Sequence, residues 1–239
     1  MNNSRRKALI TAAADGIATL VVKNAKVVNV FTKEIVEADV AIFGDTIIGV
    51  GQYTATTEID AKGSYLCPGF IDSHVHIESS MVTPAMFAHA VLGRGTTSVI
   101  ADPHEIANVS GTVGIKTMLD LSEGLPLNVF FMLSSCVPST PFENSGCTLN
   151  AADLAPLMQH ARVLGLGEVM DYESVLKKDE SMLDKLELFQ NLPIDGHAPM
   201  LTGRKLNAYR IAGPSTDHEC SNFDELLEKL RTGMYMQIR

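Results

Sequence analysis

The pair His74-x-His76 offers the side chains that most often bind a divalent metal in proteins. Residues 68–76 read PGFIDSHVH, so an apolar run leads directly into the pair. In a β-strand alternate side chains share a face, so His74 and His76 would point the same way, about 6–7 Å apart along the strand. Two neutral imidazoles on one face can converge on one metal ion, which indicates hydrolytic metal chemistry.

Further residues of the ligand type follow later predicted strands, namely Glu168, His197 and His218. Imidazole and carboxylate together suit zinc, iron or manganese. A carboxylate placed between two sets of imidazoles can bridge two metal ions, and such a site makes a strong nucleophile from water. A lone histidine near a strand end is more often structural, but five candidates in successive strand order favour a metal centre.

Five more polar residues stand close to these predicted ligands and are candidates for substrate contact or for orienting a ligand: Glu78, Asp102, His104, Glu105 and Asp217. His104 and Glu105 follow a strand and Asp102-Pro103, and a structural role in a loop is equally open for them. Asp217 is adjacent to His218, where a carboxylate can orient an imidazole. His89 and His160 fall within predicted helices and are interpreted as surface or core residues.

An alternation of strands and helices from Tyr65 onward would position these residues. We expect strands over 65–71, 95–101, 127–133, 163–167, 193–195, 215–216 and 234–238, with helices over 83–92, 111–121, 151–161, 181–189, 203–212 and 223–230. Repeated strand–helix units imply parallel strands, and polar residues gather where the strands end, as active sites do in barrels. The predicted fold is therefore α/β, an incomplete (β/α)8 barrel of the TIM type, because six units and the start of a seventh do not reach eight strands.

The segment before this alternation reads as all-β. Short β-branched runs within 18–64, separated by the turn signal Gly44-Asp45, predict a small β-sandwich-like domain. Residues 1–17 are expected to form an N-terminal extension containing a short surface helix. The partial barrel would then occupy 65–239.

Composition excludes several classes of protein. The chain has 239 residues, 46% of them hydrophobic, and a formal net charge of -9, which argues against a surface that binds nucleic acid. Apolar stretches stay below the roughly 20 residues that span a membrane. The four cysteines are widely spaced and form no C-x-x-C pair, so we expect reduced thiols and a cytoplasmic location. The cysteines are Cys67, Cys136, Cys147 and Cys220.

Five motifs resemble those of adenine deaminases in the amidohydrolase superfamily. They are PGFIDSHVHIESS at 68–80, ADPHEIANVS at 101–110, GLGEVMDY at 165–172, DGHAPMLTG at 195–203 and TDHEC at 216–220. The His-x-His pair alone is typical of the superfamily. Glu168 is more specific, because many relatives place a carboxylated lysine there. The resemblance covers nearly the whole chain.

The resemblance implies hydrolysis of adenine to hypoxanthine and ammonia at a binuclear centre. His74 and His76 would bind one metal, Glu168 would bridge, and His197 and His218 would bind the second. Manganese or iron is expected rather than zinc. A metal-activated water would attack C6 of adenine, and a carboxylate would pass the proton to the leaving ammonia. A homo-oligomer is an open expectation for the full-length parent.

The departure from the family pattern lies at the C-terminus. Relatives carry a final metal ligand and proton-transfer aspartate on the eighth strand, whereas this sequence ends at Arg239 within the apparent seventh. We therefore expect a fragment that is inactive alone, with its proton-transfer residue unassigned. Two alternatives stay open: another amidohydrolase activity on a cyclic amide or amidine, and a non-catalytic remnant that binds metal or a partner.

Overall fold

The computed structural model describes residues 1–238. The chain divides into two compact units, one ending at Pro68 and the other beginning at Gly69. All ten residues that the sequence nominates for chemistry lie in the second unit. No helix within residues 1–238 combines the length and the apolar character needed to cross a membrane.

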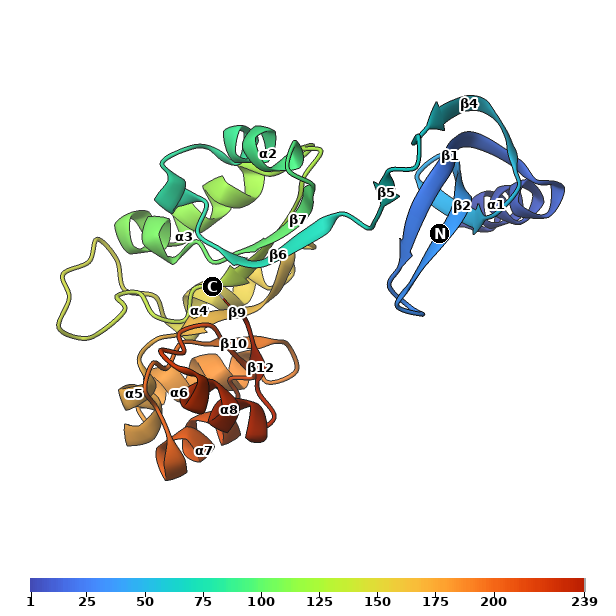
Figure 1. Cartoon of the computed structure of the whole chain (residues 1–239). Helices are drawn as coiled ribbons and strands as arrows, with labels where there is room; N and C mark the ends of the chain where they lie inside the picture. The colour runs from blue at the N-terminus through green and yellow to red at the C-terminus, as the bar shows by residue number, and fades with distance from the viewer. Residues whose placement is uncertain (239) are drawn as a thin grey trace. The chain divides into compact units, whose positions relative to one another are not determined.

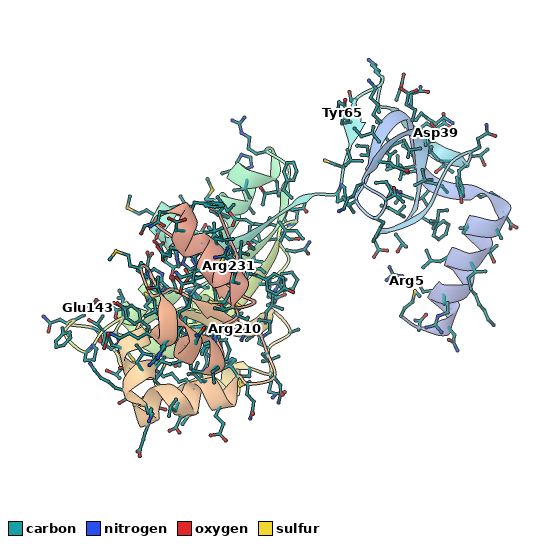
Figure 2. The ribbon with its side chains drawn as sticks, turned by 60° about the horizontal axis from the view of Figure 1, so that its bottom comes forward. Arg5, Asp39, Tyr65, Glu143, Arg210 and Arg231 are labelled. Atoms are coloured by element: carbon teal, nitrogen blue, oxygen red, sulfur yellow. The ribbon has the colours of Figure 1, made fainter. Side chains whose placement is uncertain are left out.

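The first unit is a helix followed by one five-stranded sheet. Helix α1 (Asn3–Asp15) begins where the Asn2 side chain accepts a hydrogen bond from the backbone N–H of Arg5, and it ends at Gly16 with φ 69°. The sheet has the order β3-β2-β1-β4, with β5 also paired to β1. Figure 2 shows Arg5 on the helix and Asp39 and Tyr65 on the sheet. The strands are β1 (Ile17–Asn29), β2 (Glu34–Phe43), β3 (Thr46–Val50), β4 (Thr54–Asp60) and β5 (Tyr65–Leu66).

The strand expected over 65–71 is divided between the two units. β5 pairs in parallel with β1 through Lys26–Tyr65 and Val27–Leu66, so it belongs to the first unit. The strand that carries His74 is β6 (Phe70–Val75). The boundary between compact units therefore falls after Pro68 rather than before Tyr65. An apolar run shows that a strand is present but does not show which sheet it joins.

The second unit contains a row of parallel strands in the order β10-β9-β8-β7-β6. The row continues into β11, because the backbone N–H of Ser215 donates to the carbonyl of Ile194 at 2.9 Å, and β11 pairs in parallel with β12. Seven strands in chain order make an incomplete (β/α)8 barrel. The strands after β6 are β7 (Thr96–Ala101), β8 (Asn128–Leu133), β9 (Val163–Val169), β10 (Ile194–Gly196), β11 (Thr216–Asp217) and β12 (Tyr235–Met236).

Helices connect successive strands and cover them, as the green to red ribbons of Figure 1 show. The core forms between the two layers, where Val99, Phe131 and Leu166 are fully buried against helix residues such as Ile115 and Leu206. The helices are η1 (Glu78–Ser80), α2 (Pro84–Leu92), α3 (His104–Leu121), α4 (Ala151–Leu154), η2 (Ala155–Leu157), α5 (Tyr172–Lys177), α6 (Glu180–Leu188), α7 (Gly203–Ile211) and α8 (Phe223–Arg231).

Helix α3 differs from the expected helix over 111–121, because it already begins at His104. Two helical segments meet at Gly111, whose φ of 61° and ψ of -142° suit glycine alone. A Cβ on Gly111 would also lie 2.7 Å from the sulfur of Cys147. His104 and Glu105 therefore lie in the first turn of a helix and not in a loop.

The connection between β8 and β9 is less helical than expected over 151–161. Helix α4 ends at Leu154 and only a short 3₁₀ turn follows, and Pro156 in that turn has no N–H to donate. The long loop before it packs on the kink of α3, where the backbone N–H of Gly146 donates to the carbonyl of Asn108 at 2.8 Å.

Candidate metal centre

The five predicted ligands gather at the carboxyl edge of the parallel strands. His74 lies in β6 and His76 follows its last residue, while Glu168 lies in β9. His197 directly follows β10, and His218 directly follows β11. Because the strands are parallel, their carboxyl ends meet at one edge, and residues far apart in the sequence become neighbours there.

Glu168 is the centre of this cluster, and its side chain is only 2% exposed. One carboxylate oxygen, Oε1, lies 3.0 Å from His76 Nε2 and 3.7 Å from His74 Nε2. The other, Oε2, lies 3.1 Å from His218 Nε2 and also contacts His197 Nδ1. The carboxylate thus faces one pair of imidazoles with each oxygen.

The ring nitrogens within each pair also face one another. His74 Nε2 lies 3.2 Å from His76 Nε2, and His197 Nδ1 lies 3.2 Å from His218 Nε2. In the first pair the Nδ1 atoms are engaged elsewhere, at 3.0 Å from Asp195 Oδ2 and 2.8 Å from the Asp102 carbonyl.

The donor set fits a divalent cation. With protons on Nδ1, the two Nε2 atoms of the first pair present lone pairs to one another, which is unfavourable unless a cation lies between them. Glu168 forms a group of possible ligands with each of three pairs, and within each group the ligand atoms all lie within 4.8 Å of one another. The pairs are His74 with His76, His197 with His218, and Asp102 with His104. Imidazole and carboxylate are ligands for zinc, iron and manganese.

The electrostatics of the cluster keep Glu168 ionised. Burial raises the pKa of Glu168, but its contacts with His197, His218 and His76 together lower it by a larger amount. The pKa of Glu168 therefore lies well below its ordinary value. Burial lowers the pKa of His76, but the Glu168 carboxylate and the Asp102 carbonyl outweigh this and raise it to about 9. A buried anion among imidazoles attracts positive charge, whether protons or metal ions.

Asp102 directly follows β7, supports the cluster and is 1% exposed. It accepts hydrogen bonds from the backbone N–H of Glu168 at 2.9 Å and from the Ser134 hydroxyl at 3.2 Å. Gly167 allows this approach, because a Cβ there would lie 2.1 Å from an Asp102 oxygen. His104 reaches the same region, with Nδ1 at 3.3 Å from Glu168 Oε1 and 3.6 Å from Asp102 Oδ1.

Glu78 and Glu105 lie farther out and tie η1 to the start of α3. Glu78 Oε1 accepts from the backbone N–H of Ile106 at 3.3 Å, and burial raises the pKa of this carboxyl. Glu105 accepts a hydrogen bond from the Ser79 hydroxyl.

A cavity of about 270 Å³ opens beside His104. The loop between β8 and α4 contributes Ser139 and Glu143 to it, and Figure 2 labels Glu143 on that loop. The residues that line it are His104, Glu105, Asn108, Cys136, Ser139 and Glu143.

The expectation that Asp217 orients an imidazole is wrong. Its carboxylate accepts from Lys229 Nζ at 2.9 Å and from the backbone N–H groups of Ala198 and Glu219 at 3.1 and 2.8 Å. Adjacency to His218 is misleading, because successive strand residues point to opposite faces.

Asp195, and not Asp217, is the aspartate that contacts a ligand imidazole, that of His74, and the sequence analysis did not predict it. The signal was present, because Asp195-x-His197 repeats the spacing of His74-x-His76 at the end of the fifth barrel strand. Two residues with this spacing share a face of a strand.

Comparison with known proteins agrees with this geometry. The amidohydrolase family profile matches residues 65–238. Adenine deaminase from Clostridium acetobutylicum is 58% identical over 224 residues, which are 93% of this chain and 39% of that protein. Adenine deaminase from Geobacillus kaustophilus is 53% identical over 241 residues, covering 100% of this chain and 42% of that protein. The chain thus spans about 40% of the length of these relatives.

Solved structures share the fold at low sequence identity. Atrazine chlorohydrolase TrzN from Arthrobacter aurescens, complexed with zinc, aligns with a TM-score of 0.56 and 15% identity. The alignment covers 92% of this chain and 71% of that enzyme. At this identity the likeness establishes the barrel architecture alone.

Proposed function

The chain belongs to the amidohydrolase family, and from this membership we propose that the whole protein hydrolyses adenine to hypoxanthine and ammonia. Relatives with 51–58% identity carry the name adenine deaminase, which supports adenine as the substrate. The observation that carries the chemistry is Glu168, whose two oxygens each face a pair of imidazoles.

In this proposal His74 and His76 would hold one divalent metal, His197 and His218 would hold a second, and Glu168 would offer one carboxylate oxygen to each pair. Manganese or iron is proposed as the native metal. Bound metal would supply a water molecule of lowered pKa as the nucleophile for C6 of adenine at neutral pH.

The residues of the chain itself prepare the site for this reaction. Asp102 accepts from the backbone N–H of Glu168 and so holds the part of β9 from which the carboxylate extends. Its carbonyl accepts the Nδ1 proton of His76 and turns Nε2 toward the centre. Burial of Glu168 and His218 keeps bulk water away, which strengthens the electrostatic interactions in the site.

A chimaeric protein tests the proposed reaction. Residues 1–239 would be joined to the remaining C-terminal part of the Clostridium acetobutylicum adenine deaminase, which is 58% identical over the matched part. The purified chimaera with Mn²⁺ is expected to convert adenine to hypoxanthine, measured by liquid chromatography. The matched control carries Glu168→Gln and should lose at least about 100-fold in rate, as typical of removing a group that positions the reacting centre. A folded, metal-loaded chimaera that leaves adenine unchanged contradicts the proposal.

Two further expectations belong to the same proposal. We expect the protein to act in the cytoplasm, supported by free thiols at all four cysteines. We expect the 239-residue chain alone to show little or no turnover. Assembly of the full-length protein into a homo-oligomer stays a prediction.

A further inference from the structure

The backbone of Glu168 lies just beyond the paired part of β8 and β9. The recorded pairing of these two strands ends at Leu133 and Leu166, two residues before Glu168. The N–H of Glu168 donates to Asp102 Oδ2 at 2.9 Å, and its carbonyl accepts from the Ser135 hydroxyl at 2.6 Å. Buried backbone groups need partners of this kind. Two side chains therefore continue the pairing where β8 has ended.

We propose that Ser135 and Lys185 are positioning residues for Glu168, with Lys185 of α6 holding Ser135 and Ser135 holding the Glu168 carbonyl. This relay runs from a helix of the outer layer to the carboxylate at the centre of the cluster. Because it sets where a proposed metal ligand lies, the inference rests on the metal centre of the proposed function.

The first step of the relay is the Ser135 hydroxyl. Ser135 is 1% exposed, and its hydroxyl has one proton to donate. The Glu168 carbonyl at 2.6 Å takes this proton, because the Cys136 sulfur at 3.1 Å is a weaker acceptor. The same carbonyl also accepts from the backbone N–H of Met170 at 3.0 Å, within its own segment. Ser135 thus ties Glu168 to the end of another strand.

The two side-chain contacts hold the peptide groups on both sides of the Glu168 Cα. The N–H belongs to the planar peptide before this atom, and the carbonyl belongs to the planar peptide after it. Holding both planes fixes φ and ψ at Glu168, and these angles set the direction of the Cα–Cβ bond. Asp102 alone would hold one plane, so Ser135 is needed to aim the carboxylate.

The second step of the relay is Lys185, which reaches Ser135 from α6. Lys185 is 6% exposed, and its Nζ donates to the Ser135 carbonyl at 2.8 Å. Burial lowers the pKa of Lys185, and both the amine and the ammonium have an N–H to donate. Burying a lysine costs free energy unless its polar end is bound. Lys229, also buried, contacts two carboxylates, whereas the recorded hydrogen bond of Lys185 ends at this one carbonyl.

A cavity of about 410 Å³ lies beside this contact, and both Lys185 and Ser135 line it. Lys185→Ala would enlarge the cavity and leave the Ser135 carbonyl without its donor. A small primary amine can enter that space and donate an N–H in its place. The cavity therefore allows the hydrogen bond to be restored without changing the chain.

Nuclear magnetic resonance of the metal-free chain labelled with ¹³Cδ-glutamate measures the position of Glu168. Its signal, assigned with Glu168→Gln, should move in Ser135→Ala and return in Ser135→Thr, which keeps the hydroxyl. Ser122→Ala is the matched control, because Ser122 is fully buried and donates to the Met118 carbonyl at 2.8 Å at the end of α3. It loses the same kind of hydrogen bond, and the Glu168 signal should stay in place. An unmoved signal in Ser135→Ala overturns the proposal.

Binding of Mn²⁺, followed by electron paramagnetic resonance of the free ion, tests the whole relay. The affinity should fall about 10-fold in Ser135→Ala and in Lys185→Ala. Propylamine should restore the affinity of Lys185→Ala, while tetramethylammonium, which has no N–H, should not. Such rescue shows that Lys185 supplies a hydrogen bond and not only packing. Absence of rescue, or an equal loss in Ser122→Ala, overturns the relay.

The outcomes separate this inference from the proposed function. A wild-type chain that binds no Mn²⁺ overturns the proposed metal centre, while the ¹³C signal of Glu168 still decides the role of Ser135. A wild-type chain that binds Mn²⁺, with unchanged affinity in both variants, leaves the metal centre standing and overturns the relay. Adenine turnover enters neither measurement.

Discussion

Glu168 shows at the scale of single residues how one buried carboxylate organises a site. It contacts His76, His197 and His218, and its pKa is lowered because these contacts outweigh the cost of burial. The structure brings together the five residues that the sequence nominates, because each lies at or beside the carboxyl end of a strand, and their role as ligands stays a prediction. The contacts of Asp195 and Asp217 could not be predicted, since they depend on which neighbouring strand each carboxylate faces.

Removal of one imidazole tests the ligand set. His197→Ala is expected to lower bound Mn²⁺ from two ions to about one per chain, because the second pair loses a ligand. Metal content is measured by inductively coupled plasma mass spectrometry after dialysis. His89→Ala is the control, because His89 is an exposed residue of α2. Unchanged metal content in His197→Ala would reject this ligand assignment.

Helix α8 anchors the two strand-end loops that carry His197 and His218. Lys229 is fully buried and donates to the Ala198 carbonyl at 2.7 Å, to Asp217 at 2.9 Å and to Glu225 at 2.8 Å. Glu225 in turn accepts from the backbone N–H groups of Met200 and Ser221. The buried ion network thus holds both loops against one helix.

The network should give stability that depends on pH. Burial raises the pKa of Glu225, but Lys229 and two backbone N–H groups lower it more, so the folded pKa lies below the ordinary 4.5. The unfolded chain therefore takes up the proton first, and the stability from Glu225 is present above pH 4.5 and lost as the pH falls through the folded pKa. Glu225→Gln should cost roughly 1.5–3 kcal/mol at neutral pH.

Urea unfolding between pH 7 and pH 3 measures this effect. The difference in unfolding free energy between wild type and Glu225→Gln should shrink as the pH falls. The exposed Glu187 of α6 provides the matched control Glu187→Gln, for which no such trend is expected. A difference that stays constant across this range contradicts the role assigned to Glu225.

The alternation of strands and helices was predictable at the scale of elements because the barrel repeats one pattern. The start of α3 at His104 could not be predicted, because Gly111 is typical of a residue that ends a helix. In the structure Gly111 joins two helical segments. Strand β1 likewise continues through a register shift between Val22 and Ala25, where the sequence shows only short β-branched runs. Such irregularities depend on partners elsewhere in the chain and leave no local period.

The molecule as a whole divides its tasks between two compact units. The first is a small sheet with α1, and the second contains all the candidate site residues. The division after Pro68 was not readable from sequence, because Tyr65 and Leu66 carry the same apolar signal as the strand that follows Gly69. Which sheet accepts a strand is decided by long-range pairing.

Separate expression of the units tests this division. Residues 69–239 should bind the same number of Mn²⁺ ions as the 239-residue chain, with affinity within about threefold, because every candidate ligand lies there. Residues 1–68 are the control and should bind none at this affinity. Isothermal titration calorimetry measures both. Loss of metal binding from a folded 69–239 piece would show that the first unit contributes to the centre.

The stacking of His74 on His218 has a consequence for how the chain folds. The two rings come from the first and the sixth barrel strands, so their contact closes a loop that contains most of the second unit. By chain-entropy estimates, closing a loop of this size costs about 4–5 kcal/mol. The contact is therefore among the last to form during folding. Metal ions held by the two histidine pairs together with Glu168 would act as a removable cross-link between these strands. Addition of a chelator should accordingly loosen the β11 end of the unit before the strands between β6 and β10 open.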